Sequence, residues 1–265
     1  MGLNMESMAE IYTSAVHHHM QRLWANWLPT SPVELGDIGI LEDSVFVPLA
    51  NISRFGIEIG KPQQGTIDAH QAFNSSNDVT VKLEAKGQAG IGSVTAANAT
   101  LSITFGSQHA AFFNAAGCSY FMIADKLGLA AAVMKLYDAG QWNREWVVVT
   151  DVVPSKETTV VISGAANASI VLEADASVPN INVAQLGLNL SVASSSNVGY
   201  EIVGSSGLTP LFGLSKVKSR FLWKGSDFKP ITRGGIGSKK ALQILQDSPL
   251  FETEPREYLD FVQLE

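Results

Sequence analysis

Cysteine, charge and long apolar runs are all scarce in this sequence. Cys118 is the single cysteine among 265 residues, so an internal disulfide is excluded and a reducing compartment is expected. Charged residues make up 16% of the chain, against roughly a quarter in an ordinary domain. Hydrophobic residues reach 46%, which excludes a disordered chain. The composition predicts a folded protein with a weakly charged surface, in which Cys118 is a small buried residue.

A secretory signal and a membrane-spanning helix are not visible either. Glu6 and Glu10 stand where a signal peptide carries cations, and no apolar h-region follows. No run approaches the eighteen or so apolar residues of a transmembrane helix. We expect a soluble, cytoplasmic protein, although insertion by β-strands stays open because its sequence signal is weak.

Motifs for catalysis and metal binding are also missing. The sequence has no GxSxG, HExxH, cysteine cluster or DxD pattern, and Gly204–Gly207 reads GSSG, which has the wrong spacing. His17, His18 and His19 are consecutive, and adjacent helical residues point about 100° apart, so they cannot converge on one metal. We therefore predict no catalytic residue, no metal and no cofactor. An unrecognised enzyme remains a third interpretation, because catalytic groups can assemble from distant positions.

Charge is unevenly distributed near the C-terminus. A basic segment from Lys216 to Lys240 contains eight basic residues and one acid, Asp227. An acidic tail with six acids and one base follows from Asp247 to the end. The basic segment is our candidate surface for anionic lipid or a partner. Aromatic residues inside it suit a single-strand binder, but the net charge of −7 argues against nucleic acid. The candidate surface residues are Lys216, Lys218, Arg220, Lys224, Lys229, Arg233, Lys239 and Lys240.

The hydrophobic periodicity predicts an α+β fold with a twisted, mostly antiparallel sheet. An amphipathic helix over 6–28 stops at Pro29, a hairpin spans 38–49, and 61–77 is a loop. We expect a single domain over 1–233 with a β-rich core at 35–223, then a hinge, short helix and acidic tail at 234–265. Further expected elements are a helix at 119–139, a central strand at 147–153, strands at 158–162, 169–176, 187–193 and 199–203, and a short helix at 238–246.

Two segments, 78–105 and 158–203, combine strict alternation with many small residues. Val79, Val81 and Leu83 share one face of a predicted strand, and Leu101, Ile103 and Phe105 do the same in the next. Extended to about ten residues, such strands would have the apolar and polar faces of a membrane-inserted β-hairpin.

Several stretches resemble the bacterial and fungal gasdermin-like pore-forming domains. Trp146–Val153 (WVVVTDVV) and Thr158–Val161 (TTVV) are similar to that family's aromatic-Val-Val-Thr-Glu-Val strand and its successor. Val198–Glu201 (VGYE) and Pro210–Val217 (PLFGLSKV) resemble its late Tyr-Glu-Gly and Pro-Leu-Val-Phe-Gly-Phe segment, and the hairpin at 36–55 fits in order. The resemblance covers about residues 35–223.

This resemblance implies a pore-forming effector that is held inactive by its C-terminal segment. A protease would release the segment, and the domain would oligomerise and insert hairpins at the inner face of the membrane. The chain departs from the bacterial members at residue 2, which is Gly2 rather than a lipidated cysteine. A soluble, non-catalytic binding or assembly protein of the same fold is the alternative.

Overall fold

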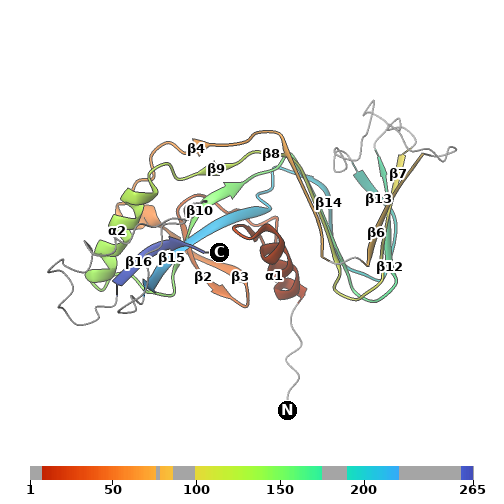
Figure 1. Cartoon of the computed structure of the whole chain (residues 1–265). Helices are drawn as coiled ribbons and strands as arrows, with labels where there is room; N and C mark the ends of the chain where they lie inside the picture. The colour runs from red at the N-terminus through yellow and green to blue at the C-terminus, as the bar shows by residue number, and fades with distance from the viewer. Residues whose placement is uncertain (1–7, 76–77, 86–98, 175–189, 221–257, 265) are drawn as a thin grey trace, which may run out of the picture.

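The structure is a computed structural model that describes residues 8–75, 78–85, 99–174, 190–220 and 258–264 (Figure 1). Within these ranges there are two α-helices, and every strand pairing between the elements is antiparallel. The predicted β-rich class with mostly antiparallel sheet is therefore confirmed.

A central sheet has the strand order β1-β15-β10-β2-β3, with β16 on β15, β9 on β10 and β4 on β9. All seven residues of β10 are buried, which confirms the predicted central strand. The predicted hairpin is also present, and its turn uses Asp43 and Ser44 in the left-handed region. The bounds are β1 Trp24–Ala25, β2 Asp37–Glu42, β3 Val45–Asn51, β4 Gln63–Gln64, β9 Phe121–Met122, β10 Val147–Val153, β15 Leu211–Arg220 and β16 Tyr258–Gln263; a 3-10 turn, Ile52–Phe55, follows β3.

Two four-stranded sheets form the rest of the molecule. The proximal sheet has the order β14-β11-β8-β5, and the distal sheet has the order β13-β12-β7-β6. A short link joins each proximal strand to its distal counterpart, so the two sheets are two long β-hairpins that bend at the same level (Figure 1). The proximal strands are β5 Ala69–Asn74, β8 Ala111–Cys118, β11 Glu157–Ser163 and β14 Val198–Ser206; the distal strands are β6 Val79–Ala85, β7 Ala99–Phe105, β12 Ala168–Ala174 and β13 Leu190–Ser196.

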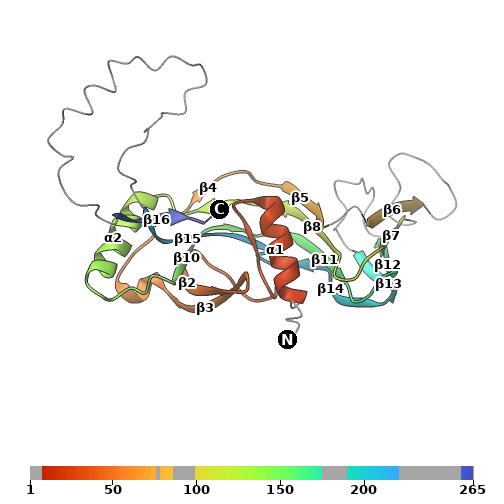
Figure 2. The same cartoon turned by 60° about the horizontal axis from the view of Figure 1, so that its bottom comes forward.

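The two helices cover different sheets (Figure 2). Helix α1 (Met8–Met20) buries Tyr12 and Val16 in one cluster with Phe113 of the proximal sheet. Helix α2 (Lys126–Asp138) buries Leu129 and Val133 in a cluster with Val148 of the central sheet. Its first turn is capped by Asp125, whose side chain accepts a hydrogen bond from the Gly128 amide at 2.7 Å.

The predicted N-terminal helix is eight residues too long at its C-terminal end. It ends at Met20, because Gln21 adopts a left-handed conformation (φ 57°) and the chain then enters β1. Trp24 and Ala25 pair with Phe212 and Leu211 of β15. Their helical spacing in the sequence is real, but sheet pairing overrides the local periodicity.

The predicted helix at 119–139 begins only at Lys126, since Phe121–Met122 form β9 against β10. The predicted loop at 61–77 is wrong over 63–64 and 69–74, which form β4 and β5. The strands predicted between residues 158 and 203 do not share a sheet with β10, because the hairpins carry them into the proximal and distal sheets. The predicted helix at 238–246 and the hinge at 234–237 lie outside the described residues.

The predicted division of the chain at residue 233 stays a prediction. One strand of the expected tail, β16, pairs with β15 in the central sheet. At least this part of the tail therefore lies against the main domain.

Candidate functional site

The distal sheet is amphipathic, as the sequence alternation predicts. On β7, Leu101, Ile103 and Phe105 are at most 1% exposed, whereas Ser102 and Thr104 between them are partly or fully exposed. Strands β6 and β12 repeat this pattern, with Val79 buried beside exposed Thr80, and Ile170 buried beside partly exposed Ser169. Strand β13 does not, because its residues 191–196 are all exposed and Val192 is 41% exposed. One face of the sheet is thus apolar and enclosed, and the other is polar.

The apolar face packs against the proximal sheet. Ile103 and Ile170 lie in one buried cluster with Phe112 and Val161, which belong to β8 and β11. The distal sheet therefore folds back over the proximal sheet, and the pair forms a V in Figure 1. Phe113, the neighbour of Phe112, points to the opposite face and packs against α1, so the proximal sheet is covered on both sides.

The bend relies on special backbone positions and on one buried hydroxyl group. His109, Asn167 and Asn197 are left-handed residues in three of the four links. The Ser163 hydroxyl accepts a hydrogen bond from the Ala110 amide at 2.9 Å and donates one to the Ser107 carbonyl at 2.8 Å. Asn and His are among the residues that adopt the left-handed conformation most readily, so these residues let the links turn between the proximal and distal strands.

Helix α1 touches this bend at its first residue. A Cβ on Gly199 would lie 2.5 Å from Met8 Cε and 3.0 Å from Gly164 Cα, so only glycine permits the two backbones and the methionine to meet. The helix thus lies across both the bend and the proximal sheet.

The structure places three of the eight candidate basic residues on one strand. Lys216, Lys218 and Arg220 alternate along β15, and Lys216 Nζ lies 3.9 Å from Glu145 Oε2. Lys224, Lys229, Arg233, Lys239 and Lys240 lie outside the described residues.

The edge of β15 that carries these residues is covered by β16. The register pairs Lys216 with Val262, Lys218 with Asp260 and Arg220 with Tyr258. This strand is not apparent from the sequence, because acidic residues and prolines dominate the tail. The available signal was Tyr258–Gln263 (YLDFVQ), which holds four large apolar or aromatic residues in six.

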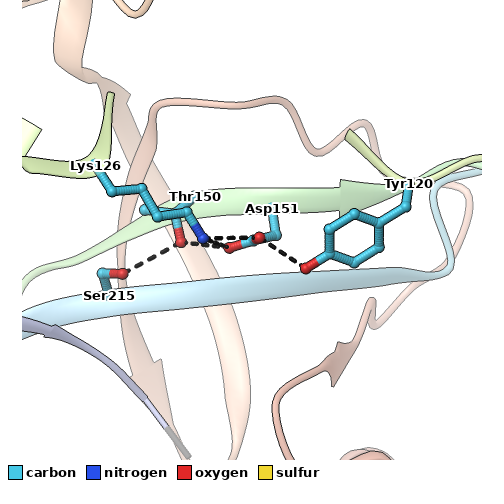
Figure 3. Close-up of polar contacts among 5 residues, drawn as sticks. All are labelled: Tyr120, Lys126, Thr150, Asp151 and Ser215. Carbon is cyan, nitrogen blue, oxygen red and sulfur yellow. Dashed lines mark hydrogen bonds and ion pairs between the residues drawn. The ribbon is translucent and has the colours of Figure 1, made fainter. Parts of the chain in front are cut away.

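A buried polar network joins the central sheet to α2 (Figure 3). Asp151 on β10 is 1% exposed, and its carboxylate accepts hydrogen bonds from Lys126 Nζ at 2.8 and 2.9 Å. The Tyr120 hydroxyl donates to it at 2.7 Å and the Thr150 hydroxyl at 2.8 Å. The Thr150 hydroxyl also lies 3.2 Å from that of Ser215 on β15.

The local backbone makes room for Asp151. The register between β10 and β15 shifts between Val149 and Asp151, and Gly213 is the residue opposite Asp151. A Cβ on Gly213 would lie 3.0 Å from Asp151 Cβ and Oδ2, so a larger residue would crowd the carboxylate. This site is not apparent from the sequence, because Asp151 is a single acidic residue within an otherwise β-branched run.

The polar groups of this network are paired with one another. Burial, followed by the hydrogen bond to Asp151, raises the pKa of Tyr120, so this hydroxyl keeps its proton and donates it to the carboxylate. The Lys126 ammonium contacts both oxygens of the same carboxylate. We interpret the network as an anchor that ties α2 and the segment before β9 to the central sheet.

Two of the three consecutive histidines contact aromatic rings. His17 stacks on Trp24 with ring centroids 3.7 Å apart, and His19 lies 4.6 Å from the ring of Phe73. In the described part of the chain, no group of three His, Cys, Asp or Glu residues could hold a metal.

Cys118 lies at a small cavity of about 170 Å³ between the segment that follows α1, the proximal sheet and the segment before β9. It is 1% exposed, as predicted, and burial raises its pKa to about 11. The cavity is lined by Leu23, Thr66, Ala69, Gln71, Cys118, Tyr120 and Val153.

We expect iodoacetamide to alkylate native Cys118 at least about a hundredfold more slowly at pH 8 than the unfolded chain, because only the thiolate reacts and a raised pKa lowers its fraction. The native rate should keep rising between pH 9 and 11, where the rate of the unfolded chain levels off. Mass spectrometry of quenched samples gives both rates. Equal native and unfolded rates at pH 8 would contradict the burial of this thiol.

Comparison with protein-family models and with curated proteins found no match to this chain. Among the residues that the structure describes, no helix is both long enough and apolar enough to span a bilayer.

Proposed function

We propose that the protein is a gasdermin-like membrane-permeabilising effector that its C-terminal segment holds inactive. The observation that carries the proposal is the distal sheet, whose apolar face is closed against the proximal sheet and whose other face is polar. Two hairpins in which β6, β7 and β12 differ so sharply between faces suit insertion into a bilayer after the bend straightens.

Straightening needs an apolar environment. In water it would expose the apolar faces of both sheets, at a cost of about 25 cal/mol per Å². In a bilayer the same face would contact lipid. Each distal strand has seven residues, and the links would extend it towards the roughly 9–11 residues that span a membrane.

Insertion also needs partners for the outer strands. Within the described residues, β14 and β13 pair on one side only, as do β5 and β6. Backbone groups inside a bilayer must be hydrogen-bonded, so these edges must meet other strands. The edges run antiparallel, because the order β14-β11-β8-β5 alternates in direction. A second copy could therefore pair head to tail, which favours a cyclic homo-oligomer.

The C-terminal segment keeps the protein inactive in this proposal. Strand β16 covers the edge of β15 at Lys216, Lys218 and Arg220, and the sequence adds five further basic residues before the acidic tail. Release of the tail by a protease would leave this basic surface available to the anionic lipids of the inner membrane face.

Leakage of a dye from liposomes tests the proposal. We expect little leakage with the intact chain, and strong leakage from anionic vesicles after limited proteolysis between Gly234 and Asp247. Vesicles of neutral lipid should leak less, because the basic surface would bind them weakly. No leakage from either form, together with a monodisperse soluble oligomer, would favour the soluble assembly protein instead.

A further inference from the structure

The edge of β15 is shared by two short strands. Its first two residues, Leu211 and Phe212, pair with β1, and its second half, from Ser215 to Arg220, pairs with β16. Strand β16 forms its backbone ladder with β15 alone in the described part of the chain. An extended segment that adds to a sheet edge in this way is the arrangement of β-augmentation.

The hydrogen-bonding pattern of this ladder follows from one bond. The Leu264 amide donates to the Leu214 carbonyl at 2.7 Å. Hydrogen-bonded pairs alternate along an antiparallel ladder, so Val262 with Lys216 and Asp260 with Lys218 are also bonded pairs. The amide of Phe261, between them, points away from β15.

An apolar anchor follows the strand. Leu264 is 7% exposed and lies in one cluster with Trp24, Phe46, Val149 and Phe212 of the central sheet. Burying a leucine side chain of this kind is worth about tenfold to a hundredfold in binding.

Charge favours the same pairing. The strand at the edge holds three basic residues and no acid, whereas the segment that pairs with it belongs to the acidic tail. The register sets Asp260 opposite Lys218, and opposite charges at directly paired positions favour strand association.

We propose that the edge of β15 is a strand-binding site whose occupant, residues 258–264 of the same chain, stays bound after a protease cuts the connection. Hydrolysis of a peptide bond within 221–257 removes the tether but none of the ladder bonds or the Leu264 anchor. Release of the strand is then a separate, reversible step. An acidic, extended peptide of the same sequence binds the emptied edge in trans.

The inference that the strand regulates leakage rests on the proposed function. The inference that the strand binds the edge of β15 does not. The full chain is cut between Gly234 and Asp247, and the fragments are passed over a size-exclusion column at micromolar concentration. The C-terminal fragment is expected to elute with the body of the protein. A fluorescein-labelled peptide of residues 257–265 should then exchange into the cut protein, measured by anisotropy, and should not bind the intact chain, whose edge is covered.

Two N-methylated peptides form a matched pair. Methylation of the Val262 amide blocks a donor that faces β15 and should weaken binding about tenfold or more. Methylation of the Phe261 amide leaves the ladder intact, so affinity should change by no more than about threefold. Leu264→Ala should weaken binding about tenfold to a hundredfold.

Separate elution of the fragment with no binding of the labelled peptide would overturn the inference, as would equal effects of the two methyl groups. If the peptide binds but the cut protein causes no leakage, the strand site stands and the proposed function fails. If the cut protein causes leakage but no peptide binds, the proposed function stands and the strand site fails. Where both hold, excess peptide should suppress leakage, and the Val262-methylated peptide should not.

Discussion

Lys126→Met is expected to lower the free energy of unfolding by about 1–3 kcal/mol, between the values for exposed and buried ion pairs, because Asp151 is buried while the Lys126 side chain is 36% exposed. The substitution keeps the length of the side chain and removes the ammonium that contacts both oxygens of Asp151. Because Asp151 is 1% exposed, its charge cannot regain water without disturbing β10. Tyr120 and Thr150 still donate to it, which keeps the loss from being larger.

Urea unfolding followed by tryptophan fluorescence measures this effect. The matched control is Lys135→Met, an exposed lysine on the same helix, which should change stability by no more than about 0.5 kcal/mol. The double variant Lys126→Met with Asp151→Asn should recover part of the loss, because it removes both charges. Equal effects of the two lysine substitutions would contradict the anchoring role of the network.

Phe113→Ala is expected to lower the free energy of unfolding by about 3–5 kcal/mol. Phe113 is 0% exposed and packs between the proximal sheet and α1, where Tyr12 and Val16 are also 0% exposed. The substitution leaves a cavity between two rigid elements that cannot close over it easily.

Phe112→Ala is the matched comparison, since it removes the same ring from the opposite face of the same strand. This variant should weaken the contact between the proximal and distal sheets rather than the contact with α1, because Phe112 packs with the apolar face of the distal sheet. Hydrogen exchange should speed up in 99–105 and 168–174 for Phe112→Ala and in 8–20 for Phe113→Ala. If the proposed function holds, cut Phe112→Ala should also cause leakage at a lower protein concentration. Identical exchange patterns in the two variants would show that the two faces of the proximal sheet do not pack independently.

The sequence was most informative where a strand was either uniformly β-branched or strictly alternating between apolar and polar residues. The β-branched run of β10 and the alternation of β6, β7 and β12 predicted their burial patterns correctly. Strand β8 (AFFNAAGC) was missed because its alanines and glycine lack strand propensity, and pairing on both sides supplies its stability instead.

The candidate site was less accessible to sequence reasoning. Asn167 and Asn197 are ordinary turn residues in the sequence, and only the matching order of the two sheets shows that their links form one bend. The pairing of β16 with β15 joins segments separated by the whole of 221–257. The network around Asp151 joins residues of α2, β10, β15 and the link before β9. Such long-range choices depend on tertiary packing, which a local pattern does not contain.

The central claim is that the closed apolar face of the distal sheet becomes the lipid-facing surface of inserted hairpins. Nitroxide spin labels at Val81, Lys82, Ile103 and Thr104, each in a Cys118→Ala background, test it by electron paramagnetic resonance with oxygen and a water-soluble nickel complex as relaxing agents. After cleavage on anionic liposomes, we expect high oxygen accessibility at Val81 and Ile103 and high nickel accessibility at Lys82 and Thr104. The high oxygen accessibility at Ile103 should be absent before cleavage, when this side chain is 0% exposed. The same accessibility at neighbouring positions, or an unchanged pattern after cleavage on leaking liposomes, would contradict it.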